Sequence, residues 1–395
     1  MKTIKRYLVP LMVFSLLLVA AVADAHVYIQ CPPDTDNIDS DGDGIVDNDH
    51  LCIHLAAGDG FIKMADGKLQ YMFGYSNVTG VPEDGVMMEG MLAAEFPAPT
   101  IKAKEGQKVY LTLTNVGMMM RPDLFDPHSL HWHGFPNAAT VFDGEPMGSI
   151  SVNMGASLTY FYQPYEPGTY LYHCHVEATE HMQMGMLGNL WLMPMQDGPA
   201  LTYQGRAYTK FAYNDGDGST GYDVDYPVQM HAFDSNFHEK HIAIQPLPFA
   251  MMKDDYPMLN GRGYPDTINP LPLAAPAENG GKASQKVSTL ITATRGQRIL
   301  LRISNLATID HYTLTVLGIP MLVVGKDARL LRSPTGENLY YETSSVNLGG
   351  GETFDVILET ANVPAGTYFL YTTNLHHLNN GTEDFGGMMT EIVIN

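Results

Sequence analysis

The sequence predicts an all-β protein that contains two copies of one β-sandwich. After residue 55, short segments of alternating hydrophobicity, such as residues 108–114, are separated by frequent glycine and proline, and no long segment has a helical period. The segment at residues 104–115 recurs at residues 294–305. A second block follows in the same order, because Gly168-Thr-Tyr-Leu-Tyr is matched by Gly366-Thr-Tyr-Phe-Leu-Tyr. Two blocks repeated in one order indicate a duplicated domain.

Length and charge limit the possible partners. The chain of 395 residues is 45% hydrophobic and 16% charged, so it can bury a large core and is long enough for two domains. It has 22 lysine and arginine residues against 43 aspartate and glutamate residues, a formal net charge of -21. Such a charge repels polyanions, which argues against a nucleic-acid or anionic-membrane partner.

Residues 1–25 are typical of a cleaved signal peptide. Lys2, Lys5 and Arg6 precede an apolar run at residues 7–22, and Ala23-Asp-Ala fits a small-x-small cleavage site. The mature chain would then begin at His26 and be periplasmic or secreted. No other stretch has the ~20 apolar residues that span a bilayer, so we expect no membrane span in the mature chain. An uncleaved membrane anchor is the alternative.

Residues 26–54 form an acidic segment that contains two cysteines. In an oxidising compartment Cys31 and Cys52 can form a disulfide across this loop, which leaves Cys174 as the unpaired cysteine of three. Four carboxylates between them have the spacing of a calcium loop, so we predict a structural calcium ion. The alternative is a solvated acidic spacer. The predicted calcium ligands are Asp39, Asp41, Asp43 and Asp47.

We place the first sandwich at residues 55–198 and the second at residues 199–395, because Met195-Gln-Asp-Gly-Pro interrupts the strand pattern. The first sandwich is dense in possible metal ligands. In a strand, residues i and i+2 share a face, so His173 and His175 point to one side and Cys174 to the other. His131 and His133 likewise project together. The spacing predicts two metal sites, one on each side of a strand.

The donors expected on the Cys174 side are two imidazoles, one thiolate and one thioether, from His128, Cys174, His181 and Met186. This is the ligand set of a blue-copper electron-transfer site. Structural zinc sites also use cysteine and histidine, but they usually show paired CxxC spacing, which is absent here. A single inert core cysteine is the remaining alternative, and it does not account for the histidines gathered around it.

These residues resemble the motifs of the multicopper oxidase family, the laccase-like members of the cupredoxin superfamily. The family pattern HPxHLHG is similar to His128-Ser-Leu-His-Trp-His-Gly, and HCHxxxHxxxGM is similar to residues 173–186, with five residues instead of three before His181. The resemblance covers roughly residues 65–395 and implies two Greek-key cupredoxin-like domains.

The resemblance also implies copper cofactors and the roles of individual residues. Type 1 copper would be bound by His128, Cys174, His181 and Met186, and electrons would pass along Cys174 to His173 and His175. Half of a type 2/type 3 copper cluster would be bound by His131, His133, His173 and His175.

The second copy lacks the ligands that would complete this cluster, which in the family are two further HxH pairs. Alignment of the repeat puts Thr315 and Leu317 at the positions of His131 and His133, and residues 371–373 near the HCH motif. The histidines that the second copy does contain are His231, His238, His241, His311, His376 and His377. We expect His311 and His376 to be the nearest to the missing ligands.

Three functions remain open at this point. The first is an oxygen-reducing multicopper oxidase whose partner is a small-molecule or redox-protein electron donor. The second is a two-domain enzyme similar to nitrite reductases, which needs one mononuclear second copper and is often a homotrimer. The third is a non-catalytic blue-copper electron carrier or copper-binding protein. The grouped histidines on the second side favour an enzyme, because such a group implies another bound metal.

Overall fold

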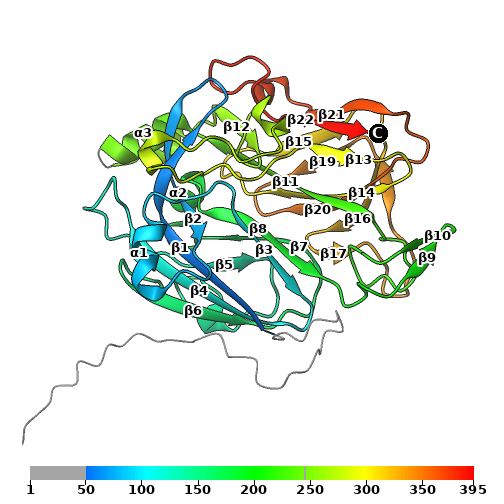
Figure 1. Ribbon diagram of the computed structural model, residues 1–395, viewed down its shortest axis with the longest axis horizontal. Coiled ribbons are helices and arrows are strands. Elements are labelled where there is room, and N and C mark those ends of the chain that lie inside the picture. The colour runs from blue at the N-terminus through cyan, green and yellow to red at the C-terminus, as the bar shows by residue number, and fades with distance from the viewer. Residues whose placement is uncertain (1–49, 244–245) are drawn as a thin grey trace, which may run out of the picture.

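The computed structural model describes residues 50–243 and 246–395, which form two β-sandwiches as the sequence predicts (Figure 1). The expected signal peptide, the four aspartates of the acidic loop and Cys31 lie outside the described residues, so the calcium site and the disulfide remain predictions. Cys174 is a free, buried cysteine. None of the helices in the described ranges combines the length and the apolar character that a membrane crossing requires.

The first sandwich has two four-stranded sheets, in the orders β2-β1-β4-β6 and β3-β8-β7-β5. Alternation along β4 buries Val109, Leu111 and Leu113 completely while Lys108 is exposed, which is why this strand forms one wall of the core. The strands are β1 (His50–Lys63), β2 (Leu69–Asn77), β3 (Ala98–Lys104), β4 (Lys108–Gly117), β5 (His131–His133), β6 (Ser157–Tyr162), β7 (Gly168–His173) and β8 (Leu187–Met193).

The second sandwich pairs a seven-stranded sheet with a five-stranded one. The first sheet has the order β12-β11-β14-β20-β16-β17, with β18 also paired to β16, and the second has the order β13-β22-β21-β15-β19. The strands are β11 (Val224–Phe233), β12 (Tyr256–Leu259), β13 (Ile291–Ala293), β14 (Arg298–Asn305), β15 (Tyr312–Val316), β16 (Met321–Lys326), β17 (Arg329–Leu330), β18 (Tyr341–Thr343), β19 (Ser345–Leu348), β20 (Thr353–Glu359), β21 (Gly366–Thr372) and β22 (Met389–Ile394). A hairpin of β9 (Leu201–Tyr203) and β10 (Arg206–Tyr208) lies between the sandwiches in sequence.

Strand pairing supports the internal repeat. The repeated blocks become β4 and β14, and β7 and β21. In the first sandwich β4 pairs in parallel with β1 and antiparallel with β6; in the second, β14 pairs in parallel with β11 and antiparallel with β20. Each copy therefore repeats the pairing as well as the sequence.

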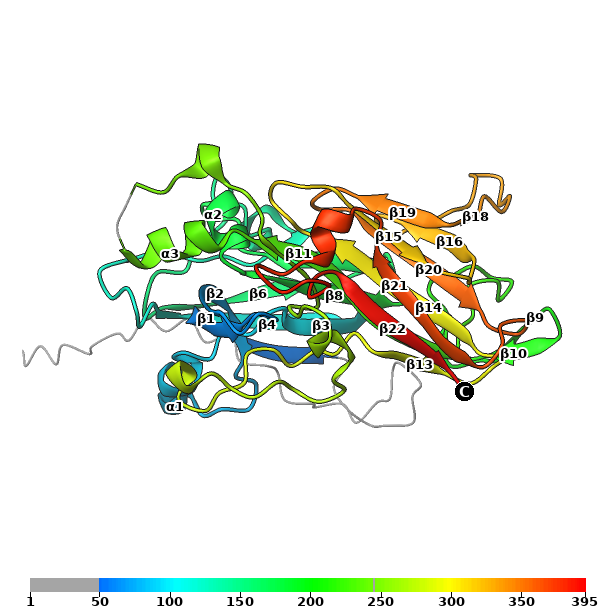
Figure 2. The ribbon, with the colours of Figure 1, turned by 90° about the horizontal axis from the view of Figure 1, so that it is seen from above.

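Few residues are helical. Helix α1 (Glu83–Gly90) packs against β1 and β4, α2 (Ala178–Gln183) follows β7 closely, and α3 (Ser235–Ala243) packs against β2. Figure 2 shows α2 and α3 at the same end of the molecule. Five short 3-10 turns complete the described helices: η1 (Thr140–Phe142), η2 (Phe249–Met251), η3 (Asp266–Ile268), η4 (Ala277–Asn279) and η5 (Leu375–Leu378).

Polar contacts fix β7 of the first sandwich against the second. Thr169 donates a hydrogen bond to Asp355 (2.6 Å), and the Thr353 hydroxyl donates to the Thr169 carbonyl (2.8 Å). Arg302 is fully buried at this boundary, where it bonds Asp225 (3.1 Å) and stacks near Trp191. A buried charge is costly unless it is paired, so a movement of the domains that separated Arg302 from its partners would be unfavourable. These contacts therefore fix the position of one domain relative to the other. The histidine motif at the end of β7 is thereby held close to the second domain.

Candidate metal centre

Strand β7 carries the predicted ligands to two opposite sides. His173 ends β7, and strand pairing sets His131 of β5 directly opposite it, with Trp132 opposite Tyr172. Cys174 and His175 follow without a break. The alternation of side chains sends the Cys174 thiol into the first core and His173 into a pocket between the domains. The structure therefore brings the eight predicted donors to two sides of one chain segment.

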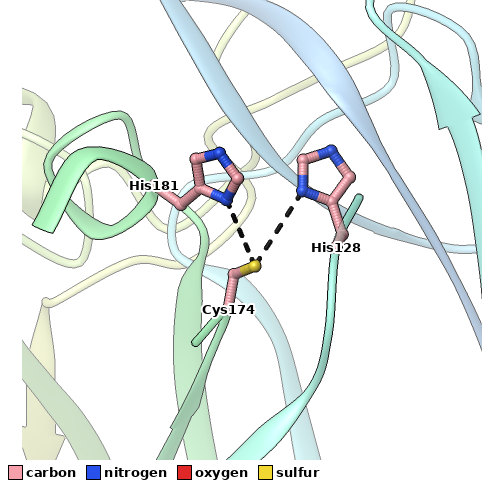
Figure 3. A group of neighbouring side chains, drawn as sticks. All are labelled: His128, Cys174 and His181. Carbon is pink, nitrogen blue, oxygen red and sulfur yellow. Dashed lines mark hydrogen bonds between the residues drawn. The ribbon is translucent and has the colours of Figure 1, made fainter. Parts of the chain in front are cut away.

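On the core side, three donor atoms converge (Figure 3). Sγ of Cys174 lies 3.2 Å from Nδ1 of His181 and 3.9 Å from Nδ1 of His128. All three residues are fully buried. Met186 is also fully buried in the same core cluster. Its backbone amide donates a hydrogen bond to the His181 carbonyl (2.9 Å), which fixes the position of Met186 relative to His181.

Two local features create this convergence. His128 precedes β5 and is held by a pair of backbone hydrogen bonds with Val152. His181 lies on α2, and Gly185, at φ 113°, turns the chain back so that Met186 returns beside His181. A Cβ on residue 185 would lie 2.8 Å from the Phe73 carbonyl, so a larger residue would not fit this turn.

The chemistry of this group fits a copper ion. Burial lowers the pKa of His128 to about 3 and holds the pKa of His181 well below its usual value, so both imidazoles are neutral and have a free lone pair. Burial raises the pKa of the Cys174 thiol to about 11, and the Ser129 amide donates to its sulfur (3.4 Å). A metal that favours thiolate and imidazole would replace the thiol proton. Nε2 of His128 and of His181 are buried without a hydrogen-bond partner in the described structure.

The opposite side gathers four imidazoles, His131, His133, His173 and His175. Their ring centroids lie 4.9 to 6.0 Å apart in the neighbouring pairs. Ring nitrogens of His131, His133 and His173 all lie within 4.8 Å of one another, whereas His175 is outside that group of three. A set of imidazoles at this spacing offers the nitrogen donor atoms that copper or zinc binds.

Hydrogen bonds orient two of these rings. Nδ1 of His131 is 2.6 Å from the Asp143 carbonyl, and Nδ1 of His173 is 2.8 Å from the Cys174 carbonyl. A carbonyl only accepts, so each Nδ1 carries the proton and each Nε2 has the free lone pair. Burial lowers the pKa of both imidazoles, which keeps them neutral. Both are therefore prepared to bind a metal through Nε2.

These imidazoles line a cavity of about 460 Å³ between the two domains, here called the histidine pocket. Its first-domain wall contains the four histidines with Ala178, Thr179 and Met182. Its second-domain wall contains residues 306–311 with Gly350 and Gly351. None of the described residues that line it is a lysine or arginine, and Asp310 is its single carboxylate.

The second-domain histidines fall into two groups. His231, His238 and His241 are buried elsewhere: His231 bonds the Leu306 carbonyl (3.1 Å), and His238 contacts the carbonyls of Tyr71 and Gln183. Of the two expected to be nearest the missing ligands, His311 lines the histidine pocket, whereas the exposed His376 is not part of its lining. Thr315 bonds the Ser344 carbonyl and Leu317 is 60% exposed, so neither reproduces an HxH pair.

An acidic cluster that the sequence motifs do not indicate lies beside His181. Nε2 of His181 is 4.0 Å from Asp126, and Glu180 bonds the fully buried His241 of α3 at 2.5 Å. Arg121 ties the loop before Asp126 to the His241 carbonyl. Phe73 lies edge-on to both His181 and His241. The outer edge of His181 is thus covered by α3, which no spacing near the copper motifs could indicate.

Known proteins are similar to both halves of the chain. Two family profiles, each described as multicopper oxidase, match residues 76–197 and 249–389. Laccase-3 of Thanatephorus cucumeris is 23% identical over 313 residues, 78% of this chain and 46% of that protein. L-ascorbate oxidase of Nicotiana tabacum is 22% identical over 302 residues, 73% of this chain and 45% of that protein. The chain thus spans about half the length of these relatives.

Solved structures share the fold. A blue copper oxidase from Nitrosomonas europaea superposes with a TM-score of 0.63 at 23% identity, over 87% of this chain and 86% of that one. A copper nitrite reductase from the same organism gives a TM-score of 0.57 at 15% identity, over 88% and 94%. At these identities the likeness establishes the cupredoxin-like architecture of both domains, and it leaves the choice of reaction to the site itself.

Proposed function

The chain belongs to the multicopper oxidase family, and we therefore propose that it is a copper-dependent oxidoreductase in which electrons enter at the Cys174 site and oxygen is reduced in the histidine pocket. Type 1 copper would be held by His128, Cys174, His181 and Met186. The second copper site would be held by His131, His133, His173 and His175.

One observation carries this proposal: Cys174 lies at the junction between the two groups of donor side chains. Its thiol lies with His128 and His181, while its neighbours His173 and His175 line the histidine pocket. Its carbonyl also accepts the hydrogen bond from Nδ1 of His173 (2.8 Å). A covalent path and a hydrogen-bonded path therefore both join the sulfur to an imidazole on the other side. A protein that only carries electrons would not need the second group of imidazoles.

Copper bound at these residues would supply reversible one-electron oxidation and reduction. The protein's own contribution is to fix the donors before the metal arrives. The Asp143 carbonyl and the Cys174 carbonyl select the tautomers of His131 and His173, and the dry core around Cys174 excludes water from the sulfur.

The lining of the histidine pocket supports a neutral oxidant. No lysine or arginine is present among its described lining residues, Asp310 adds a negative group, and the whole chain has a formal charge of -21. This surrounding disfavours an anion such as nitrite and does not disfavour dioxygen. Nitrite reduction is the second candidate, supported by the similar architecture of the nitrite reductase.

The test is to load the purified protein with copper, remove loose metal, and measure both copper per chain and oxygen uptake with a reducing one-electron donor. The proposal predicts at least two coppers per chain and an oxygen uptake that Cys174→Ser abolishes. Nitrite consumption without oxygen uptake would favour the second candidate. A single copper per chain with neither reaction would make the protein an electron carrier and refute the proposal.

Three wider proposals rest on sequence patterns. We propose export, with His26 as the mature N-terminus, because residues 1–25 have the three regions of a signal peptide. We propose a small-molecule or redox-protein donor that is neutral or cationic, because the chain is strongly acidic. We propose a calcium ion at Asp39, Asp41, Asp43 and Asp47, because these carboxylates have the spacing of a calcium loop. One preparation of the secreted protein tests two of these proposals: N-terminal sequencing checks the cleavage before His26, and metal analysis checks for calcium.

A further inference from the structure

We propose that Ser129 is a positioning residue that joins the two copper sites, with its amide on the sulfur of Cys174 and its hydroxyl on the backbone of His175. The inference rests on the proposed function and adds to it a residue outside the ligand set. Ser129 directly follows His128, at the position that is proline in the family pattern HPxHLHG. Proline has neither an N–H nor a hydroxyl, so the motif implies neither contact.

The first observation is that Ser129 bonds to both sites from one place. Its amide donates to Sγ of Cys174 (3.4 Å), and its hydroxyl oxygen accepts a hydrogen bond from the His175 amide (3.1 Å). The sulfur lies with His128 and His181, whereas His175 lines the histidine pocket. Ser129 therefore connects the sulfur to the pocket side of the chain, in addition to the covalent path through Cys174.

The second observation is that the backbone on both sides of Ser129 is fixed. Tyr75 donates to the Ser129 carbonyl (2.6 Å), and the next amide, that of Leu130, donates to the Tyr160 hydroxyl (3.1 Å). His128, the residue before it, is held by two backbone hydrogen bonds. Ser129 and the two tyrosines are fully buried. An amide that is held in this way keeps its direction toward the sulfur without reorganisation.

The amide contact acts on the sulfur of Cys174. Hydrogen bonding around the cysteine sulfur is one of the features that set the reduction potential of a blue-copper site. An N–H directed at the sulfur stabilises the additional negative charge of the reduced state, so Ser129 raises this potential. The hydroxyls of Ser129 and Tyr75 also contact the thiol. The Tyr75 proton, however, is directed at the Ser129 carbonyl, which leaves the amide as the donor fixed by the backbone.

The hydroxyl contact acts on the pocket side. His175 lies beyond the end of β7, so its amide is outside the strand ladder and uses the Ser129 hydroxyl as its acceptor. Because a partly buried backbone amide requires an acceptor, this bond fixes the peptide from which the His175 imidazole extends. Without the hydroxyl, that imidazole would be less well positioned for a metal in the histidine pocket.

The experiment compares the full copper-loaded chain in four forms: the natural sequence, Ser129→Ala, Ser129→Pro and Ser76→Ala. Ser129→Ala removes the hydroxyl and keeps the amide, whereas Ser129→Pro removes both. Ser76 is the matched control, because it is a buried serine of the same sandwich whose hydroxyl has no hydrogen-bond partner in the described structure. Equilibrium with a one-electron mediator measures the potential of the blue site, and competition with a chelator measures copper affinity at the second site.

We expect Ser129→Pro to lower the ratio of reduced to oxidised blue site, at a fixed mediator potential, by about threefold or more. Ser129→Ala should keep most of the natural ratio but weaken copper binding at the second site by about threefold or more. Ser76→Ala should change neither quantity. A natural ratio in Ser129→Pro, or a natural affinity in Ser129→Ala, would overturn the inference while leaving the proposed function in place.

A second measurement does not depend on the folding of Ser129→Pro. The natural protein is unfolded and refolded in D₂O, so that buried amides exchange, and its resonance Raman spectrum is compared with that of protein refolded in H₂O. The copper–sulfur stretching band should shift, because the Ser129 amide bonds the sulfur. An unshifted band would overturn the inference. A natural protein that binds copper only at the blue site, or shows no blue band, would overturn both the inference and the proposed function.

Discussion

Nδ1 of His133 and Nε2 of His173, two residues that line the histidine pocket, lie 3.3 Å apart. Because Nδ1 of His173 donates to the Cys174 carbonyl, its Nε2 has a free lone pair that points toward His133. Only a shared proton or a metal can stabilise two imidazole nitrogens at this separation. His173 therefore links the two parts of the centre: its Nδ1 bonds the backbone carbonyl of Cys174, and its Nε2 faces His133 in the histidine pocket.

The first prediction concerns His133. His133→Ala should remove the second-site copper and the oxygen uptake while the blue band of the Cys174 site remains, because His133 lines the histidine pocket and is not among the residues grouped with the Cys174 thiol. Its ring is half-buried, so the copper-free variant should keep the natural fold. Copper per chain, absorption and circular dichroism check this. A variant that loses its blue band but keeps its fold would show that the two sites are not separable as proposed.

The second prediction concerns Cys174. Cys174→Ser should abolish the blue band, because a hydroxyl with a very high pKa does not replace a thiolate ligand. Stability should fall by no more than about 1 to 2 kcal/mol, since the change in volume is small although the site is dry. Absorption spectra and denaturant unfolding of the copper-free proteins measure both effects. A blue Cys174→Ser protein would refute the ligand assignment.

The sequence sufficed for the architecture and for the two-sided arrangement at β7. Both follow from short-range rules, since alternation along a strand separates Cys174 from His173 and His175, and the repeat at residues 104–115 and 294–305 identifies equivalent strands. The cover over His181 could not be foreseen, because His241 reaches Glu180 through the packing of α3 on β2. Sequence likewise could not separate His311 from His376, since only the fold decides which of them faces the pocket.

The third prediction concerns the buried pair Glu180 and His241, 2.5 Å apart and 10% and 0% exposed at their side chains. His241→Ala should destabilise the protein by about 3 kcal/mol, because it leaves the Glu180 carboxylate buried without its partner. The double variant Glu180→Gln with His241→Ala should recover part of this loss. Denaturant unfolding of the two single variants and the double variant gives the coupling energy.

His238 serves as the comparison for this cycle. It is equally buried on the same helix, but its ring nitrogens contact the backbone carbonyls of Tyr71 and Gln183, and no carboxylate of the described residues bonds them. His238→Ala combined with Glu180→Gln should therefore give additive losses. Strong coupling in this comparison, or additivity in the first cycle, would mean that the Glu180 contact is not the source of the stabilisation.

The last prediction concerns Asp254, which lies between the domains, where it accepts a hydrogen bond from Tyr312 (2.9 Å) and contacts Gln183 (3.4 Å). Burial, helped by the nearby charges of Asp310 and Asp234, raises the pKa of the Asp254 carboxyl to about 7, although the hydrogen bonds from Tyr312 and Gln183 oppose the shift. The folded protein therefore holds a proton that the unfolded chain releases near pH 4. Between about pH 4 and pH 7, the contribution of Asp254 to the free energy of unfolding therefore falls as pH rises, and above about pH 7 it no longer changes.

Asp254→Asn should remove that dependence, because an amide accepts the Tyr312 hydrogen bond without ionising. The stability of the variant relative to the natural protein should rise by up to about 1.4 kcal/mol per pH unit between pH 5 and pH 6.5 and become constant above pH 8. Tyr312→Phe should move this window to higher pH, since it removes the donor that favours the carboxylate. Denaturant unfolding curves of the natural protein, Asp254→Asn and Tyr312→Phe across this pH range measure these differences, with the same copper content in all three proteins. A stability difference that is flat or that shrinks with pH would show that the carboxyl of Asp254 ionises in the folded protein as readily as in the unfolded chain.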